Sequence, residues 1–297
     1  MAFKLNLVNK RLSKIDERNV RVAKNKLAGY IEKHCEANNL RSEKIKVGKI
    51  DIRYFCVGQG DPLIIVHGGG GSGSAWLQNA IELSNYYTVY IPDLPGFGRS
   101  KSISEDFDLL EYVSFLEDFS SSLGLKDFHL AGHSLGGGIA LHYALMFPHK
   151  VRRLVLISSL CLGKEIALWP RILSNAKIYR FLKNIIVSLL CAIKSLWSIF
   201  NKPFTFEHPR FLLRMSVGQC VMTFKGQTAV LLNCLSKLLM PTLLIWGARD
   251  SIVPARHAYA AARLIPDCQV HIFEKCGHSA YRRKVPEFSK LLVRFLR

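Results

Sequence analysis

One serine, one histidine and one aspartate in this sequence have the types and the setting that nucleophilic catalysis requires. Ser134 lies in the segment GHSLG (132–136), which matches the pattern G-x-S-x-G. A serine hydroxyl is a weak nucleophile until a neighbouring base takes its proton. Histidine can be that base near neutral pH, and an aspartate can hold the imidazole in the correct tautomer. His278 and Asp250 can supply these two groups.

The setting of Ser134 favours a nucleophile elbow. The apolar run FHLAG (128–132) predicts a strand just before it, and LGGGIALHYALMF (135–147) predicts a helix just after it. A sharp strand-to-helix turn exposes the serine above a sheet and needs small neighbours. The glycines that meet this need are Gly132, Gly136, Gly137 and Gly138. The alternative is a glycine-rich turn with an incidental serine.

A second glycine-rich loop, HGGGGSG (67–73), follows the predicted strand LIIVH (63–67). Acyl transfer develops negative charge on an oxygen, which backbone N–H groups can stabilise. We predict that the amides of Gly69 and Leu135 form this oxyanion hole and that His67 braces the loop. The loop also fits the dinucleotide pattern G-x-G-x-x-G, but no acidic residue ends a clean second strand about twenty residues later. No Gly-Lys-Ser/Thr follows, which excludes a phosphate-binding P-loop.

The base and the acid are expected in two loops near the C-terminus. His278 follows the predicted strand QVHIF (269–273), and Asp250 follows TLLIWG (242–247). Loops after parallel strands meet at the carboxyl edge of the sheet, to which the serine also points. The chain order serine, aspartate, histidine is the one expected of a fold with this elbow. The alternative for Asp250 is an aspartate in a surface turn.

Other candidates for these roles are less suitable. His133 is next to the serine but would point away from it, so we interpret it as structural. Asp93, in DLPGFGRS (93–100), is interpreted as bracing its own loop. The other strand end that could carry an acid offers only Ser158 and Ser159.

The elements that must position these residues alternate between strand and helix from Glu43 onward. KIKV (44–47) and KIDIRYFCV (49–57) predict a hairpin around Gly48, and further short apolar runs predict strands at 63–67, 87–91, 128–132, 151–158, 242–247 and 269–273. Helical patterns occupy 109–124, 135–147, 255–265 and 286–296. This alternation predicts an α/β fold, with a mostly parallel sheet of about eight strands and helices on both faces.

The sequence predicts a core in two parts, 43–159 and 240–297, with a helical cap inserted at 160–239, because that stretch is too long for an ordinary connection. Residues 1–42 form a basic N-terminal extension with apolar residues at roughly helical spacing. This extension is either a helix packed on the main body or a basic surface for a membrane or a partner.

Composition restricts the class of protein. The chain has 297 residues, 49% of them hydrophobic, which indicates a globular protein. None of its eight cysteines has C-x-x-C spacing, so we expect no metal site. We also expect no cofactor. The cysteines are expected to be free thiols in a reducing compartment such as the cytoplasm. We expect no secretory signal and no membrane-spanning run, because the N-terminus is charged throughout and no apolar stretch reaches about eighteen residues.

The segments HGGGGSGSAW, DLPGFGRS, GHSLGG, GARDSIVP and CGH, taken together, resemble the α/β-hydrolase superfamily over about residues 43–297. The resemblance implies a serine hydrolase with the triad Ser134, Asp250 and His278. The serine disfavours the epoxide hydrolases and haloalkane dehalogenases, which place an aspartate at this position.

Two subgroups of that superfamily are similar to this chain. HGGGGSGSAW resembles the carbon–carbon bond hydrolases of meta-cleavage products, but those typically have asparagine and tryptophan where this chain has His133 and Ser279. GHSLGG and the C-terminal segment resemble monoacylglycerol-lipase-like esterases. The prediction is a carboxylic-ester hydrolase for a hydrophobic acyl or aromatic substrate. The alternatives are a carbon–carbon hydrolase and a non-catalytic ligand-binding protein.

Positive charge is concentrated in the expected cap. The formal net charge of the chain is +19, and residues 160–239 contain eleven Lys and Arg against two Glu. The same window contains the apolar runs 185–193 and 196–200. Two interpretations remain open: a cap packed over the active site, or a peripheral contact with an anionic membrane. Nucleic-acid binding is not expected, because the basic residues alternate with long aliphatic side chains. The oligomeric state stays open.

Overall fold

A computed structural model describes residues 40–100, 107–173 and 221–297 of the chain, with isolated positions between 175 and 188. The predicted extension over 1–42 therefore lies almost entirely outside the described residues. Strand β1 begins at Arg41, two residues before the expected start of the core, because Arg41 and Ser42 pair with Cys56 and Phe55 of the next strand.

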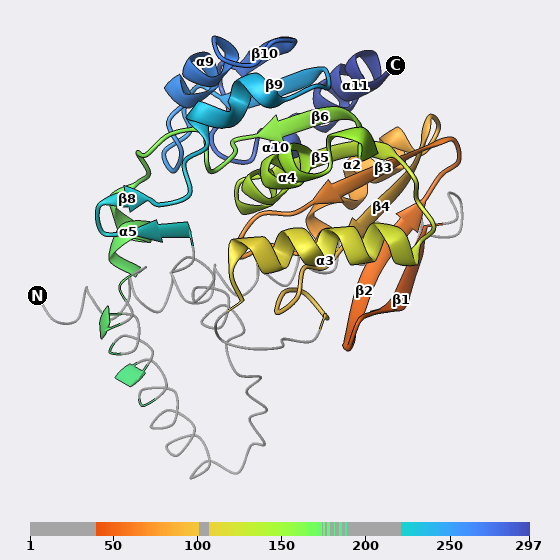
Figure 1. Cartoon of the computed structure of the whole chain (residues 1–297), viewed down its shortest axis with the longest axis horizontal. Coiled ribbons are helices and arrows are strands. Elements are labelled where there is room, and N and C mark those ends of the chain that lie inside the picture. Colours follow the sequence, from red (N-terminus) through yellow and green to blue (C-terminus); the bar gives the residue numbers. More distant parts are fainter. Residues whose placement is uncertain are drawn as a thin grey trace, which may run out of the picture.

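The core is an eight-stranded sheet with the order β1-β2-β4-β3-β5-β6-β9-β10 (Figure 1). The strands are β1 (Arg41–Val47), β2 (Ile50–Val57), β3 (Asp61–Val66), β4 (Tyr87–Pro92), β5 (Phe128–His133), β6 (Val151–Ile157), β9 (Thr242–Gly247) and β10 (Cys268–Phe273). β2 pairs antiparallel with both β1 and β4, and the pairs from β4 to β10 are parallel. The predicted mostly parallel sheet of about eight strands is confirmed.

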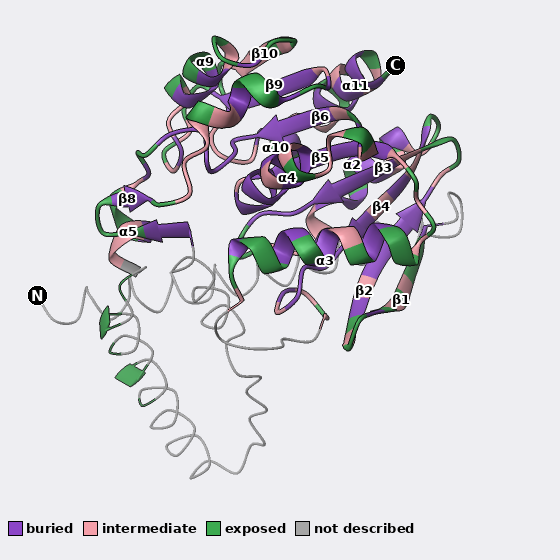
Figure 2. Ribbon diagram, in the orientation of Figure 1, coloured by how far each residue is buried: buried purple, intermediate pink, exposed green. Residues whose placement is uncertain are grey.

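Helices cover both faces of this sheet. Helices α3 (Leu109–Ser122), α4 (Leu135–Met146) and α9 (Arg256–Ala262) pack on one face, and α2 (Leu77–Leu83) and α11 (Val285–Leu296) pack on the other. Side chains of β3 alternate between the two layers: Ile64 and Val66 join the first hydrophobic cluster, and Leu63 and Ile65 join the second. The central strands are buried on both faces, which explains their unbroken apolar runs (Figure 2).

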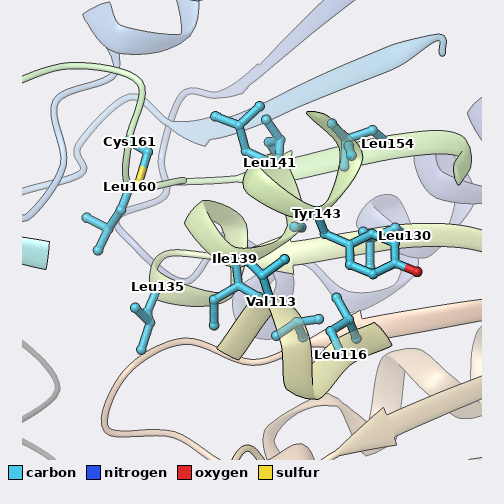
Figure 3. Close-up of a cluster of buried hydrophobic side chains, with 14 of the residues drawn as sticks. Val113, Leu116, Leu130, Leu135, Ile139, Leu141, Tyr143, Leu154, Leu160 and Cys161 are labelled. Carbon is cyan, nitrogen blue, oxygen red and sulfur yellow. The ribbon is translucent and has the colours of Figure 1, made fainter. Parts of the chain in front are cut away.

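The contact between α3, α4 and the sheet holds the start of α4 in place. Val113 and Leu116 of α3 belong to the same buried cluster as Ile139 of α4 and Leu130 of β5 (Figure 3). Helix α3 begins at a capping box, in which the Asp108 carboxylate accepts the Glu111 amide and the Glu111 carboxylate accepts the Asp108 amide. The junction between β5 and α4 is thus set on a rigid base.

Other short elements connect these layers. They are the 3₁₀ turns η1 (Gly73–Trp76), η2 (Pro148–Lys150) and η3 (Leu232–Lys237), the helices α5 (Leu168–Leu173) and α10 (Ala280–Arg283), and the two-residue strands β7 (Met222–Thr223) and β8 (Gly226–Gln227). Sequence analysis did not predict α2 or the β7–β8 pair, because each is too short to show a clear period. In the described ranges, no helix has the length and apolar character needed to cross a bilayer.

The window 160–239 leaves and rejoins the core at one narrow neck. The side chain of Gln227 accepts the Cys161 amide at 2.8 Å and donates to the Glu165 carbonyl oxygen at 3.1 Å. The Gln227 amide donates to the Lys164 carbonyl oxygen, and the Leu231 amide to that of Cys161, both at 2.9 Å. Much of the segment beyond this neck lies outside the described residues, so the helical cap stays a prediction.

Candidate active site

Ser134 occupies the turn between β5 and α4 in a strained backbone conformation. Its φ is +54°, a region that L-residues other than glycine seldom adopt. The turn is held from several sides: the Ser134 amide donates to the Ile157 carbonyl oxygen at 2.9 Å, and its own carbonyl oxygen accepts the amides of Gly138 and Leu160, both at 3.1 Å. Strain of this kind persists only where the surroundings over-determine it, as in functional turns.

The glycines on either side of the turn are required by close packing. A Cβ atom on Gly132 would lie 2.2 Å from the Gly136 carbonyl oxygen, and one on Gly136 would lie 2.3 Å from the Val66 carbonyl oxygen. No side chain fits at these distances. Helix α4 therefore starts directly against the end of β3, close to the glycine-rich loop that follows it.

His278 and Asp250 form a hydrogen-bonded pair. The distance from His278 Nδ1 to Asp250 Oδ2 is 2.8 Å, and the carboxylate side chain is fully buried whereas the imidazole is 15% exposed. Asp250 Oδ1 accepts the amides of Ile252 at 2.9 Å and Val253 at 3.0 Å. An ionised carboxylate only accepts hydrogen bonds, so Nδ1 carries the imidazole proton and Nε2 is the basic nitrogen.

The electrostatics of this pair keep the carboxylate charged. Burial alone would raise the pKa of Asp250, but the hydrogen bond from His278 and the two backbone amides outweigh it and hold that pKa below its ordinary value. The two loops are also joined to each other, because the Arg249 amide donates to the Cys276 carbonyl oxygen at 2.9 Å. The acid and the base are therefore joined both by their side chains and by the backbone of their loops.

His133 connects this pair to the serine turn. Its Nε2 lies 2.8 Å from the carbonyl oxygen of His278, and the two imidazole rings are 4.8 Å apart between centroids. A carbonyl oxygen only accepts, so Nε2 is the donor. Burial, with a smaller contribution from the nearby His278, lowers the pKa of His133 to about 3, so its ring is neutral at physiological pH. The residue before the serine thus contacts the residue predicted to be its base.

The two residues whose amides are predicted to form an oxyanion hole are close neighbours. A Cβ atom on Gly69 would lie 3.7 Å from Cδ2 of Leu135. Leu135 is the first residue of α4, so its amide has no carbonyl oxygen within the helix to bond.

A comparison of the whole chain with known proteins decides its family. The profile described as "alpha/beta hydrolase fold" matches residues 61–187 and 196–283, well over half of the chain. The chain belongs to the α/β-hydrolase fold family. The family prediction made from the sequence is confirmed, and the fold supports a hydrolase.

Proteins similar to this α/β-hydrolase in sequence or in fold carry the names of more than one kind of hydrolase. It is 26% identical over 273 residues to 2-hydroxy-6-oxo-6-phenylhexa-2,4-dienoate hydrolase of Comamonas testosteroni, with 83% of this chain and 91% of the relative covered. A solved membrane phospholipase A, described as a bacterial virulence factor, has a TM-score of 0.68 at 23% identity and covers 100% of this chain and 98% of its own. Carboxylesterase CesB of Bacillus subtilis has a TM-score of 0.66 at 20% identity, covering 91% and 97%.

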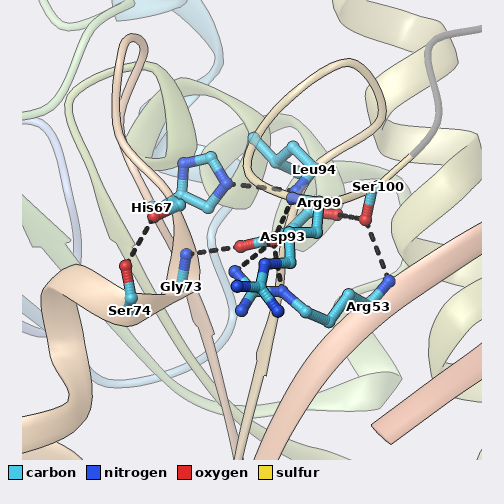
Figure 4. A network of polar contacts seen from close by, with 9 residues as sticks. Arg53, His67, Gly73, Ser74, Asp93, Leu94, Arg99 and Ser100 are labelled. Atoms are coloured by element: carbon cyan, nitrogen blue, oxygen red, sulfur yellow. Dashed lines mark hydrogen bonds and ion pairs between the residues drawn. The ribbon is translucent and has the colours of Figure 1, made fainter. Parts of the chain in front are cut away.

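The α/β-hydrolase also contains a second buried aspartate, which braces the predicted oxyanion loop. Asp93 accepts the Gly73 amide at 2.7 Å through one oxygen, and Arg53 Nε at 2.7 Å and the Arg99 amide at 2.8 Å through the other (Figure 4). His67 contributes on the same side, since its Nε2 accepts the Leu94 amide at 3.1 Å. These contacts agree with the bracing roles expected for Asp93 and His67.

Sequence reasoning missed a group of residues that anchors the histidine loop of this α/β-hydrolase. The ring of Tyr281 stacks on Trp76 with centroids 3.8 Å apart and planes 7° apart. Asn79 Nδ2 donates to the Tyr281 carbonyl oxygen at 3.2 Å. Tyr281 lies three residues after His278 and both partners lie near the start of α2, so no local pattern signals the contact.

In the described part of the chain, no cluster of His, Cys, Asp or Glu residues could hold a metal ion. The five cysteines within these ranges are free thiols, and Cys56, Cys161 and Cys276 are buried. Burial raises the pKa of Cys161 to about 12, so this thiol stays protonated and unreactive at neutral pH.

Proposed function

We propose that this chain is a serine hydrolase of carboxylic esters in which Ser134 is the nucleophile, His278 the general base and Asp250 the orienting acid. One observation carries this proposal. The buried Asp250–His278 pair sits in a loop whose carbonyl oxygen is bonded to the neighbour of a serine held at positive φ. A strained serine, an imidazole and an ionised carboxylate are the parts that acyl transfer needs.

In the acylation step, the Ser134 oxygen attacks the carbonyl carbon of the ester while its proton passes to His278 Nε2. The carbonyl oxygen becomes an oxyanion, which the amides of Gly69 and Leu135 would stabilise. The imidazolium is stabilised by Asp250, which keeps its charge because its pKa is low. The tetrahedral intermediate then expels the alcohol, which takes the proton from His278, and leaves an acyl-serine.

Deacylation repeats these steps with water in place of serine. A water molecule gives one proton to His278 Nε2 and attacks the acyl carbon, and the same two amides would hold the second oxyanion. Ser134 leaves with the proton that His278 returns, and the carboxylic acid is released. No cofactor is needed, because every proton is carried by one imidazole.

Two residues beside the site favour ester over carbon–carbon bond hydrolysis. The carbon–carbon hydrolases that the sequence resembles typically have asparagine before the serine, where this chain has His133 bonded to the base residue. They also have tryptophan after the catalytic histidine, where this chain has the much smaller Ser279. These differences support an ester as the substrate.

The proposal is tested with purified full-length protein and nitrophenyl esters of increasing acyl length. We expect turnover and labelling of Ser134 by a fluorophosphonate probe. The substitution Ser134→Ala should lower kcat/KM by about 10⁵-fold or more. The matched control is Ser122→Ala, because Ser122 is exposed at the end of α3 and its hydroxyl donates only to the Asp118 carbonyl oxygen of the same helix. A folded wild-type protein that neither hydrolyses any ester nor reacts with the probe would contradict the proposal.

The similarity to the Comamonas testosteroni enzyme makes carbon–carbon bond hydrolysis the second candidate, since this chain covers 91% of that relative. It is tested with 2-hydroxy-6-oxo-6-phenylhexa-2,4-dienoate in the same preparation. A kcat/KM for this compound well above that for every ester would reassign the substrate class. The roles proposed for Ser134, His278 and Asp250 would be unchanged.

A further inference from the structure

Beyond the neck, the chain presents large apolar side chains to the solvent on α5 and on the turn between β7 and β8. Leu168 and Trp169 of α5 are 56% and 54% exposed, and Phe224 of the turn is 56% exposed. The two elements are joined, because Arg171 Nε donates to the Phe224 carbonyl oxygen at 2.6 Å and the guanidinium lies over the Phe224 ring. We name Leu168, Trp169, Arg171, Phe224 and Lys225 the α5 surface.

The exposed apolar character continues along the chain after α5. Ile178, Phe181 and Ile185 are described helical positions that are all exposed, with Phe181 at 65%. Their spacing of three and four residues places them on one face of a helix. Isolated exposed apolar residues are ordinary, but a run of them on adjoining elements, with tryptophan and phenylalanine among them, marks an interaction surface.

Among the described residues of the segment that carries this surface, every charged side chain except Glu165 is basic. Lys164, Lys177 and Lys225 are exposed, and Arg171 is held beside Phe224. The acidic residue nearest along the chain, Glu165, is engaged by His257 Nε2 at 2.7 Å and by Arg256. Aromatic and aliphatic side chains surrounded by lysine and arginine suit the boundary between lipid headgroups and acyl chains. Each basic side chain near an anionic leaflet strengthens binding by about fivefold.

We propose that the α5 surface docks this protein on an anionic lipid bilayer, with Trp169 and Phe224 inserted at the headgroup boundary. α5 and the β7–β8 pair lie beside the sheet edge at which β5 and β6 end, the edge that carries Ser134 (Figure 1). Docking there would bring the candidate active site to the lipid surface. The inference does not depend on the chemistry proposed for Ser134.

The test is flotation of the full-length protein with phosphatidylcholine vesicles, prepared with and without phosphatidylglycerol. We expect binding to the anionic vesicles that weakens at high salt and little binding to the neutral ones. The double substitution Trp169→Ala/Phe224→Ala should weaken binding by at least about tenfold, since it removes the two aromatic anchors. Lys225→Glu should weaken it by about tenfold or more, since it replaces an attraction with a repulsion.

The matched control is Tyr259→Ala/Leu264→Ala, which removes two comparably exposed apolar side chains at α9. This variant should bind as the wild type does. Turnover of a water-soluble short-chain ester should be unchanged in every variant, which separates loss of docking from loss of catalysis. Equal binding by the wild type and the Trp169→Ala/Phe224→Ala variant would overturn the proposal. The proposal would also be overturned if the wild type bound no vesicles and instead formed a dimer that the Trp169→Ala/Phe224→Ala variant does not form.

Discussion

Two aspartates with buried side chains follow strands β4 and β9, which end at the same edge of the sheet with three strands between them, and their partners differ in kind. Asp93 is surrounded by a permanently charged group and by amides: Arg53 contacts it at 2.5 and 2.7 Å, and the amides of Gly73 and Arg99 complete its shell. Asp250 also accepts two amides, but its remaining partner is the titratable imidazole of His278 at 2.8 Å.

This difference separates a structural carboxylate from one that can take part in chemistry. An arginine cannot give up its proton at any ordinary pH, so the Asp93–Arg53 pair has a single state and joins two loops. A histidine can gain and lose a proton during each turnover, so the charge of Asp250 can stabilise the imidazolium in every cycle. Burial alone, which both aspartates share, does not distinguish the two roles.

The largest expected effect comes from Asp250→Asn. The neutral side-chain amide of asparagine has no negative charge and accepts the hydrogen bond from Nδ1 less well than the carboxylate. The imidazole therefore loses its fixed orientation, and its charged form is no longer stabilised. We expect kcat for ester hydrolysis to fall by about 10⁴-fold while the circular dichroism spectrum stays that of the wild type. Asp267→Asn, at an exposed aspartate before β10, is the control and should retain full activity. Retained kcat in Asp250→Asn would mean that the two aspartates do not differ as described.

The second effect falls on stability rather than on turnover. Asp93→Asn leaves the guanidinium of Arg53, whose side chain is only 12% exposed, without a counter-charge. We expect the free energy of unfolding in urea to drop by about 3–5 kcal/mol. The control, Asp127→Asn, breaks an ion pair with Arg152 in which both side chains are 40% exposed, and should cost about 1 kcal/mol or less. Equal losses in the two variants would remove the distinction.

A third measurement asks whether Asp250 alone fixes the imidazole. His133→Phe removes the donor to the His278 carbonyl oxygen and leaves that buried acceptor unpaired. We expect kcat to fall by about tenfold with little change in KM, because the loop that carries the base loses one anchor. His133→Gln, whose amide can still donate, should recover part of this loss. If His133→Phe turned over esters at the wild-type rate, His133 would be only a packing residue.

The smallest effect is on the pH dependence of stability. Burial lowers the pKa of His133 to about 3 and that of His129, also on β5, to about 4, against an ordinary value of 6.5. Between pH 6.5 and those values the unfolded chain binds protons that the folded chain does not. Each of these histidines therefore lowers the free energy of unfolding by about 1.4 kcal/mol for each pH unit of acidification.

Urea denaturation at several pH values between about 6 and 4 measures this slope. His133→Phe and His129→Phe should each make it less steep by about one proton. Only His133→Phe should also lower kcat, because His129 lies four residues before it on β5 and, within the described part of the chain, makes no hydrogen bond to the histidine loop. An unchanged slope in both variants would show that neither imidazole is neutral in the folded protein for the reason given.

The sequence predicted the strands, the main helices and the loops of the candidate site, because these follow from local patterns. The apolar runs of β3 and β5 and the glycines around Ser134 are features of consecutive residues. The stacking of Tyr281 on Trp76 and the bond from His133 to the His278 carbonyl oxygen join residues far apart in the chain, so no local period reveals them. The oxyanion hole and the cap remain predictions.

The neck held by Gln227 allows the segment between its two sides to change in length without disturbing the core. The side chain of Gln227 bonds to the backbone of Cys161 and Glu165, so Glu165 and Gln227 are 62 positions apart in sequence but adjacent in space. A longer loop between fixed ends costs only about 0.6 kcal/mol for each doubling of its length. The intervening stretch can therefore be shortened, extended or swapped as a cassette, while the strands that carry the serine, the aspartate and the histidine keep their register.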